Sequence, residues 1–128
     1  MANLRIDIIE IDRLEMAIEC LPRLPAKVFT TTERDYCLSR RRPAVFLAAR
    51  FAAKEAILKA MGVGLGSCAF RELEITRDCT GRPGVLLHGQ ARELASSLGI
   101  SRIVVSLSHC QAYATAVAMA LEEPLRGD

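Results

Sequence analysis

A chain of 128 residues has the length of one domain, and its 51% hydrophobic residues suffice for a packed core without metal or disulfide support. A net charge of +2 gives no electrostatic argument for nucleic-acid binding. Five scattered cysteines without a C-x-x-C pair argue against a disulfide framework or zinc knuckle and suit a reducing cytosol. With neither a signal peptide nor a membrane span expected, the sequence predicts a cytoplasmic domain over residues 1–128 that binds neither nucleic acid nor membrane.

The first third of the chain predicts one strand and two helices. Residues 4–11 are rich in isoleucine and are predicted as a strand, and the apolar spacing of residues 12–21 predicts a helix. Two prolines then break the chain. Thr30 with Glu33 has the pattern of a capping box, which predicts a short helix over residues 31–38.

The longest predicted helix covers residues 43–61 and ends at Gly62. Alanine, leucine and other apolar residues occupy nearly its whole circumference, which is typical of a buried helix. It nevertheless carries four charged residues, Arg50, Lys54, Glu55 and Lys59. Buried charges are costly unless they pair or bind something, so these four are candidates for a functional site. The alternative is an ordinary surface pair between Glu55 and Lys59.

The second half of the chain predicts four strands and one more helix. The strands are expected over residues 70–77, 85–87, 103–107 and 113–121, and the helix over 90–98. A turn at 108–111 joins the last two strands into a hairpin, and the polar tail over 122–128 is predicted to be frayed. This order of elements predicts an α+β fold, with an antiparallel sheet around the long buried helix.

Two features suggest that the long helix handles phosphate. Asp7 in the first strand lies either at a solvated edge or beside Glu55, where the two carboxylates would suit Mg²⁺, which completes its shell with water and substrate phosphates. The glycine loop after the helix offers backbone N–H groups to phosphate through Gly62, Gly64 and Gly66. Because the loop follows a helix, it is neither a P-loop nor a dinucleotide fingerprint.

A serine and a histidine stand together in the predicted hairpin turn. Ser108 and His109 invite comparison with serine hydrolases, but the chain has no G-x-S-x-G motif. A single histidine on a turn is more often exposed to solvent than catalytic. The pair therefore does not define a reaction by itself.

Taken together, these motifs resemble the holo-[acyl-carrier-protein] synthase family, the small 4′-phosphopantetheinyl transferases. The matching segments are I-D-I-x-E-I at 6–11, F-T-x-x-E at 29–33, R-F-A-A-K-E-A at 50–56, G-R-P at 81–83 and S-L-S-H at 106–109. They follow the family's order over nearly the whole chain. One position departs from the family: Arg5 stands where a glycine is usual, two residues before Asp7.

The resemblance implies a fold, a reaction and a set of site residues. The reaction transfers 4′-phosphopantetheine from coenzyme A to a serine of an apo acyl carrier protein with Mg²⁺, giving the holo carrier and adenosine 3′,5′-bisphosphate. Asp7 and Glu55 are implied as metal ligands, and Glu55 and Lys59 as catalytic residues. The implied coenzyme-binding residues are Arg50, Lys54, Gly62, Gly64, Gly66, Gly81, Arg82, Pro83, Ser106 and His109. The base that activates the serine is either a water on the metal or Glu55 acting through one.

The resemblance also implies partners. The carrier protein is normally acidic, and Arg13, Arg23 and Lys27 are expected to steer it, unless they form only a solvated basic surface. The run of arginines at 40–42 is expected to bind the 3′-phosphate of the coenzyme, to bind the carrier, or only to keep a loop soluble. The family is typically a homotrimer with sites between subunits. The carrier belongs to fatty-acid, polyketide or peptide synthesis. Two alternative functions stay open: a non-catalytic module that binds coenzyme A or the carrier, and, ranked below it, a nucleotide-binding regulator.

Overall fold

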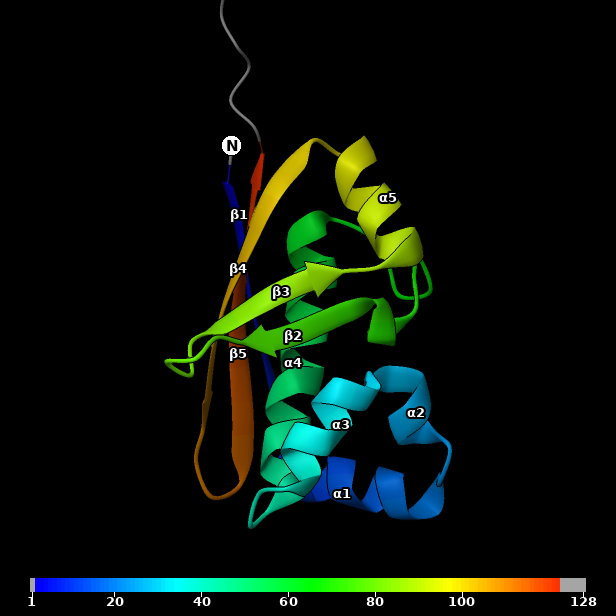
Figure 1. Ribbon diagram of the computed structural model, residues 1–128, viewed down its shortest axis with the longest axis vertical. Helices are drawn as coiled ribbons and strands as arrows, with labels where there is room; N and C mark the ends of the chain where they lie inside the picture. The colour runs from blue at the N-terminus through cyan, green and yellow to red at the C-terminus, as the bar shows by residue number, and fades with distance from the viewer. Residues whose placement is uncertain (1, 123–128) are drawn as a thin grey trace, which may run out of the picture.

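Two antiparallel sheets lie on either side of one long helix (Figure 1). The computed structural model describes residues 2–122. The larger sheet has the order β1-β5-β4, from β1 (Ala2–Glu10), β5 (Tyr113–Glu122) and β4 (Ile100–His109). The smaller is the hairpin of β2 (Leu73–Arg77) and β3 (Pro83–Leu87).

The helices fall into three groups in Figure 1. At one end of the molecule are α1 (Ile11–Cys20), α2 (Leu24–Val28) and α3 (Thr31–Leu38). The central helix is α4 (Pro43–Met61). The 3₁₀ turn η1 (Phe70–Glu72), which contacts both α2 and α5, leads into β2. At the other end of the molecule, α5 (Gly89–Ser97) connects β3 to β4. The predicted α+β class and the antiparallel pairing are confirmed.

Local signals set both ends of α4, as predicted. Pro43 occupies its first turn, where a missing N–H costs nothing. Gly62 ends it in the left-handed region with φ 75°, which a residue without Cβ adopts readily. Fourteen of the nineteen residues in α4 are buried, including Arg50 and Lys54, so the prediction of a buried helix is correct.

Small side chains allow α4 to pack closely against the larger sheet. The inward positions of β5 are all alanine and all buried: Ala114, Ala116, Ala118 and Ala120. Alternation along a strand places every second residue on one face, so these alanines form a single stripe. Three of them, Ala116, Ala118 and Ala120, share a core cluster with alanines of α4 that include Ala52, Ala53 and Ala56, and Ala114 joins a second cluster with Ala48 and Ala49.

The opposite face of the larger sheet is apolar and open to solvent. Leu4, Ile6 and Ile8 of β1 are 55%, 66% and 63% exposed. In register beside them on β5 lie Met119, Val117 and Thr115. An exposed apolar surface of this extent is typical of an association surface.

The structure differs from the sequence predictions at several boundaries. The helix α2 was not predicted, because two prolines there suggested only a break; Pro25 sits in its first turn instead. Residues 70–72 form a 3₁₀ turn rather than strand, and β4 begins at Ile100, earlier than expected. Of the tail predicted to be frayed, Glu122 ends β5, and residues 123–128 lie outside the described residues. Within residues 2–122, no helix has the length and apolar character to cross a membrane.

Candidate active site

An acidic pair lies between β1 and α4. The pleat of β1 turns Asp7 toward α4, where its Oδ2 accepts a bond from Lys59 Nζ at 3.2 Å. The Oδ1 atom of Asp7 accepts from the backbone N–H of Ile8 at 2.9 Å. The Asp7 side chain is only 14% exposed, whereas that of Lys59 is 53% exposed. Thus Asp7 is held in place while the lysine ammonium stays accessible.

Glu55 completes this pair. Burial raises the pKa of Glu55, the neighbouring Asp7 carboxylate raises it further, and Lys59 partly opposes both effects. Two carboxylates held this close repel each other, and a divalent cation would relieve the repulsion. Within residues 2–122, no cluster of three or more His, Cys, Asp or Glu side chains could hold a metal by itself. A pair of hard oxygen donors fits Mg²⁺, which commonly takes one or two protein carboxylates.

A second part of the site is a pocket of about 210 Å³ between α3, α4, β2 and the end of β4. It brings together four predicted coenzyme-binding residues, Arg50, Gly81, Pro83 and His109. The His109 ring meets the ring of Phe46 edge-on, with centroids 5.6 Å apart. The pocket therefore joins residues that are distant in sequence, and their common role in binding the coenzyme stays a prediction.

Positive charge gathers around one aromatic ring in this pocket. The guanidinium carbons of Arg50, Arg77 and Arg40 lie 4.6, 4.4 and 4.8 Å from the centroid of the Tyr36 ring. Arg50 is 5% exposed, and its Nε has no hydrogen-bond partner in the described part of the chain. Three guanidinium groups and an unsatisfied buried donor make the pocket suited to an anion.

Three further residues line this pocket and were not among the predicted site residues: Tyr36, Phe46 and Arg77. A signal for Arg77 was present, because alternation along β2 places it on the same face as Leu73 and Ile75. Ile75 and Arg77 do line the pocket together.

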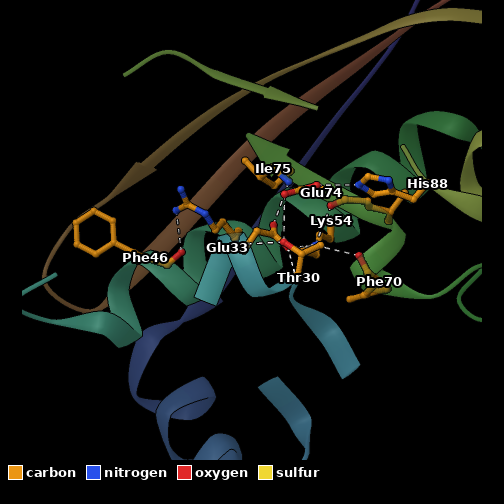
Figure 2. Close-up of polar contacts among 10 residues, drawn as sticks. Thr30, Glu33, Phe46, Lys54, Phe70, Glu74, Ile75 and His88 are labelled. Carbon is orange, nitrogen blue, oxygen red and sulfur yellow. Dashed lines mark hydrogen bonds and ion pairs between the residues drawn. The ribbon is translucent and has the colours of Figure 1, made fainter. Parts of the chain in front are cut away.

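The structure does not support Lys54 as a coenzyme-binding residue. Its side chain is fully buried and its ammonium donates to Glu33 Oε1 at 2.9 Å, to Phe70 O at 2.9 Å and to Leu73 O at 2.8 Å (Figure 2). An ammonium has three donors, so none remains for a ligand. Burial lowers the pKa of Lys54, and the Glu33 carboxylate opposes that effect. Lys54 instead links α4 to α3, η1 and β2.

The network around Lys54 extends to the surface. Glu33 Oε1 also accepts from the backbone N–H of Thr30, and Thr30 Oγ1 accepts from the backbone N–H of Glu33, which together form the predicted capping box of α3. Glu33 Oε2 accepts from the backbone N–H of Ile75 on β2. The Thr30 hydroxyl donates to Glu74, whose other oxygen lies 2.7 Å from His88 Nε2. Figure 2 shows this chain of contacts running from the core to His88.

Other predicted coenzyme positions lie apart from the pocket. Ser106 is exposed on the outer face of β4, opposite Val117, whereas His109 belongs to the other face of that strand. Arg82 lines a separate groove of about 510 Å³ between β3 and β4. The glycine loop follows the C-terminal end of α4, where side-chain atoms at Gly62, Gly64 and Gly66 would meet open space.

Helix geometry separates the acidic pair from the pocket within one chain. Arg50 and Glu55 are five residues apart on α4, which places them about 140° apart around the helix axis. Glu55 faces Asp7 on β1, while Arg50 faces Tyr36 on α3. The two parts of the site therefore open in different directions.

The predicted carrier-binding residues lie at the end formed by α1 and α2. Arg13, Arg23 and Lys27 are all exposed. Arg23 and Lys27 line a hollow of about 360 Å³ together with Leu21, which is 57% exposed. Exposed apolar and basic side chains thus occur side by side on this surface.

Comparison with known proteins agrees with this geometry. Residues 6–118 match the model of the 4′-phosphopantetheinyl transferase superfamily. A holo-[acyl-carrier-protein] synthase of Moorella thermoacetica is 60% identical over 119 residues, 93% of each chain. One from Chlamydia trachomatis is 45% identical over 122 residues, covering 94% of this chain and 99% of the relative. The chain therefore belongs to the 4′-phosphopantetheinyl transferase superfamily, and the predicted enzyme class is confirmed.

Solved structures show the same fold. A Plasmodium yoelii acyl carrier protein synthase with ADP bound superposes with a TM-score of 0.88 at 30% identity, over 95% of this chain and 96% of that one. A Helicobacter pylori holo-[acyl-carrier-protein] synthase in complex with coenzyme A gives 0.81 at 26% identity, over 92% and 99% of the two chains.

Proposed function

We propose that this protein transfers the 4′-phosphopantetheine group of coenzyme A to a serine hydroxyl of an acidic apo acyl carrier protein. The observation that carries the proposal is the acidic pair: Asp7 of β1 lies beside Glu55 and Lys59 of α4. Another side of α4 lines the arginine-rich pocket. The relatives named as synthases of the holo carrier, and the one solved with coenzyme A, support this choice of substrates.

Asp7 and Glu55 would hold Mg²⁺. When bound, the ion neutralises charge on phosphate oxygens during phosphoryl transfer. Lys59 now holds Asp7 at 3.2 Å, and its exposed ammonium can also reach a phosphate at this position. A water on the metal, or Glu55 acting through a water, takes the proton of the serine hydroxyl.

The arginine-rich pocket takes the adenosine bisphosphate end of the coenzyme in this proposal. Arg50 and Arg77 supply bidentate donors for a phosphate, and His109 adds a ring N–H. The Gly81–Pro83 turn is fixed by Asp78, whose Oδ1 accepts from Thr80 N and Arg82 N, each at 2.9 Å. The wall of the pocket is therefore preorganised for binding.

We also propose a homotrimer in the cytoplasm, with each site shared between subunits. The exposed apolar face of β1 and β5 supplies a surface for association. The acidic pair and the arginine-rich pocket face different directions on α4, so one subunit's pair can meet its neighbour's pocket. Five free cysteines suit a reducing compartment.

The test is a mass-shift assay. A panel of apo carriers from fatty-acid, polyketide and peptide synthesis is incubated with the protein, coenzyme A and Mg²⁺, and transfer adds roughly 340 Da to the carrier. Asp7→Ala and Glu55→Ala are expected to abolish the gain. Binding of coenzyme A without any mass gain would favour the non-catalytic alternative and contradict the proposal.

A further inference from the structure

One cation beside the acidic pair has no role in the mechanism above. Arg5 lies on β1 two residues before Asp7, opposite the buried Ala118 of β5. Residues two apart on a strand share a face and lie about 6.6 Å apart. Arg5 and Asp7 therefore stand next to each other on the side of the sheet that faces α4.

The neighbours of Arg5 on that face are firmly placed. On one side, Asn3 Nδ2 donates to Ala60 O at 2.8 Å. On the other, Asp7 is held by Lys59. The Lys59–Ala60 turn of α4 thus lies against this part of β1. Because β1 is an edge strand with β5 on one side only, Arg5 has solvent along its free edge.

The guanidinium of Arg5 is not used within the described residues. Its one hydrogen bond is from Nη1 to Leu4 O at 3.3 Å, at an exposed position. None of the carboxylates in residues 2–122 forms an ion pair with it, and the neighbouring Asp7 pairs with Lys59 instead. An arginine offers five donors in a planar fork that matches phosphate oxygens, and most of these remain available here.

We propose that Arg5 is a coenzyme-binding residue, whose guanidinium binds the pyrophosphate of coenzyme A beside Asp7 and Lys59. The inference rests on the proposed function, because it assigns the phosphates to the acidic pair. Arg5 and Lys59 together offset the charges of Asp7 and Glu55, so the site no longer repels a pyrophosphate before a metal binds, and the unused N–H donors of Arg5 can bind it. Coenzyme binding should therefore depend less on Mg²⁺ than it would with an uncharged residue at this position.

The experiment measures coenzyme A binding by calorimetry, in EDTA and at saturating Mg²⁺. Arg5→Gln removes the charge and leaves a shorter, polar side chain, whereas Arg5→Lys keeps the charge. Arg92→Gln, at an exposed position on α5 far along the chain from the site, is the matched control. In EDTA we expect Arg5→Gln to bind about tenfold more weakly than the unmodified protein, the equivalent of about 1.4 kcal/mol. Arg5→Lys should retain most of the affinity, and Arg92→Gln should change it less than about twofold.

The measurement at saturating Mg²⁺ tests whether Arg5 contacts the pyrophosphate. If Arg5 and the metal neutralise the same phosphate oxygens, the loss in Arg5→Gln shrinks when Mg²⁺ saturates the site. An equal loss with and without Mg²⁺ would overturn the placement at the pyrophosphate. Unchanged binding in Arg5→Gln, or an equal loss in Arg5→Lys, would overturn the role of the charge. If the unmodified protein binds no coenzyme A under either condition, the proposed function itself fails, and this inference with it.

Discussion

Lys54 and Glu55 are adjacent in sequence, but their side chains lie in different parts of the molecule. A step of 100° around α4 sends Lys54 into the core against Glu33, while Glu55 reaches Asp7 at the edge of the sheet. The buried ammonium is tolerated because one carboxylate and two backbone carbonyls surround it. Both residues belong to the same motif, yet only one of them remains in the proposed site.

Replacing Lys54 by methionine should destabilise the protein strongly. The substitution leaves the Glu33 carboxylate buried without a counter-charge, which costs about 3–5 kcal/mol of unfolding free energy. Urea denaturation measures the loss, and Lys27→Met, at an exposed position, serves as the control. In the fraction that stays folded, the KM for coenzyme A should change less than about twofold. A large rise in KM with little loss of stability would restore Lys54 to the coenzyme site.

The thiols should react in an order set by their surroundings. Burial raises the pKa of Cys37 to about 11, so its thiol stays protonated and shielded. The backbone N–H groups of Ala112 and Tyr113 lower the pKa of the exposed Cys110, so its thiolate forms at a lower pH than the usual 9.0. Timed alkylation of the native protein below pH 9.0, followed by peptide mass spectrometry, should label Cys110 first and Cys37 last. Early labelling of Cys37 would mean that α3 is not packed as described.

At the scale of elements, the end of α4 depends on one backbone conformation. Gly62 has a φ of 75°, and a Cβ there would meet no atom within 4 Å, so Gly62→Ala is strained only through its backbone. The expected cost is about 1–2 kcal/mol of unfolding free energy. Gly64 has equal space and no positive φ, so Gly64→Ala should change stability by less than about 0.5 kcal/mol. Equal effects in urea denaturation would contradict the left-handed cap.

Elements with strong local signals were predictable from sequence, and contacts between elements were not. The capping box of Thr30 and the ends of α4 gave correct helix boundaries, because each depends on neighbouring residues. The network that captures Lys54 joins α3, α4 and β2, and no local pattern shows that Glu33 would turn toward it. The pairing of Asp7 with Glu55 could be offered from the residues only as one of two alternatives, since the two are 48 positions apart and periodicity does not bring their elements together; the family resemblance favoured it.

At the scale of the whole molecule, the outer face of the larger sheet should control association. Ile6 is 66% exposed at its centre, so Ile6→Asp places a charge in the proposed interface and should yield a monomer in analytical ultracentrifugation. Leu86→Asp is the control, because Leu86 is also exposed, at 50%, but lies on β3. The circular dichroism of both variants should match that of the unmodified protein. A trimer that survives Ile6→Asp would place the interface elsewhere.

Shared sites predict that two inactive variants can restore each other. Asp7→Ala removes a proposed metal ligand, and Arg50→Ala removes a guanidinium from the pocket that opens in another direction on α4. In trimers re-formed from an equal mixture, about a quarter of the sites would combine an intact acidic pair from one subunit with an intact pocket from its neighbour. The mass-shift assay should then recover activity that neither variant has alone. If the variants mix into common trimers and stay inactive, the acidic pair and the pocket of one chain must serve the same site, and the 140° between Arg50 and Glu55 is spanned by the coenzyme itself.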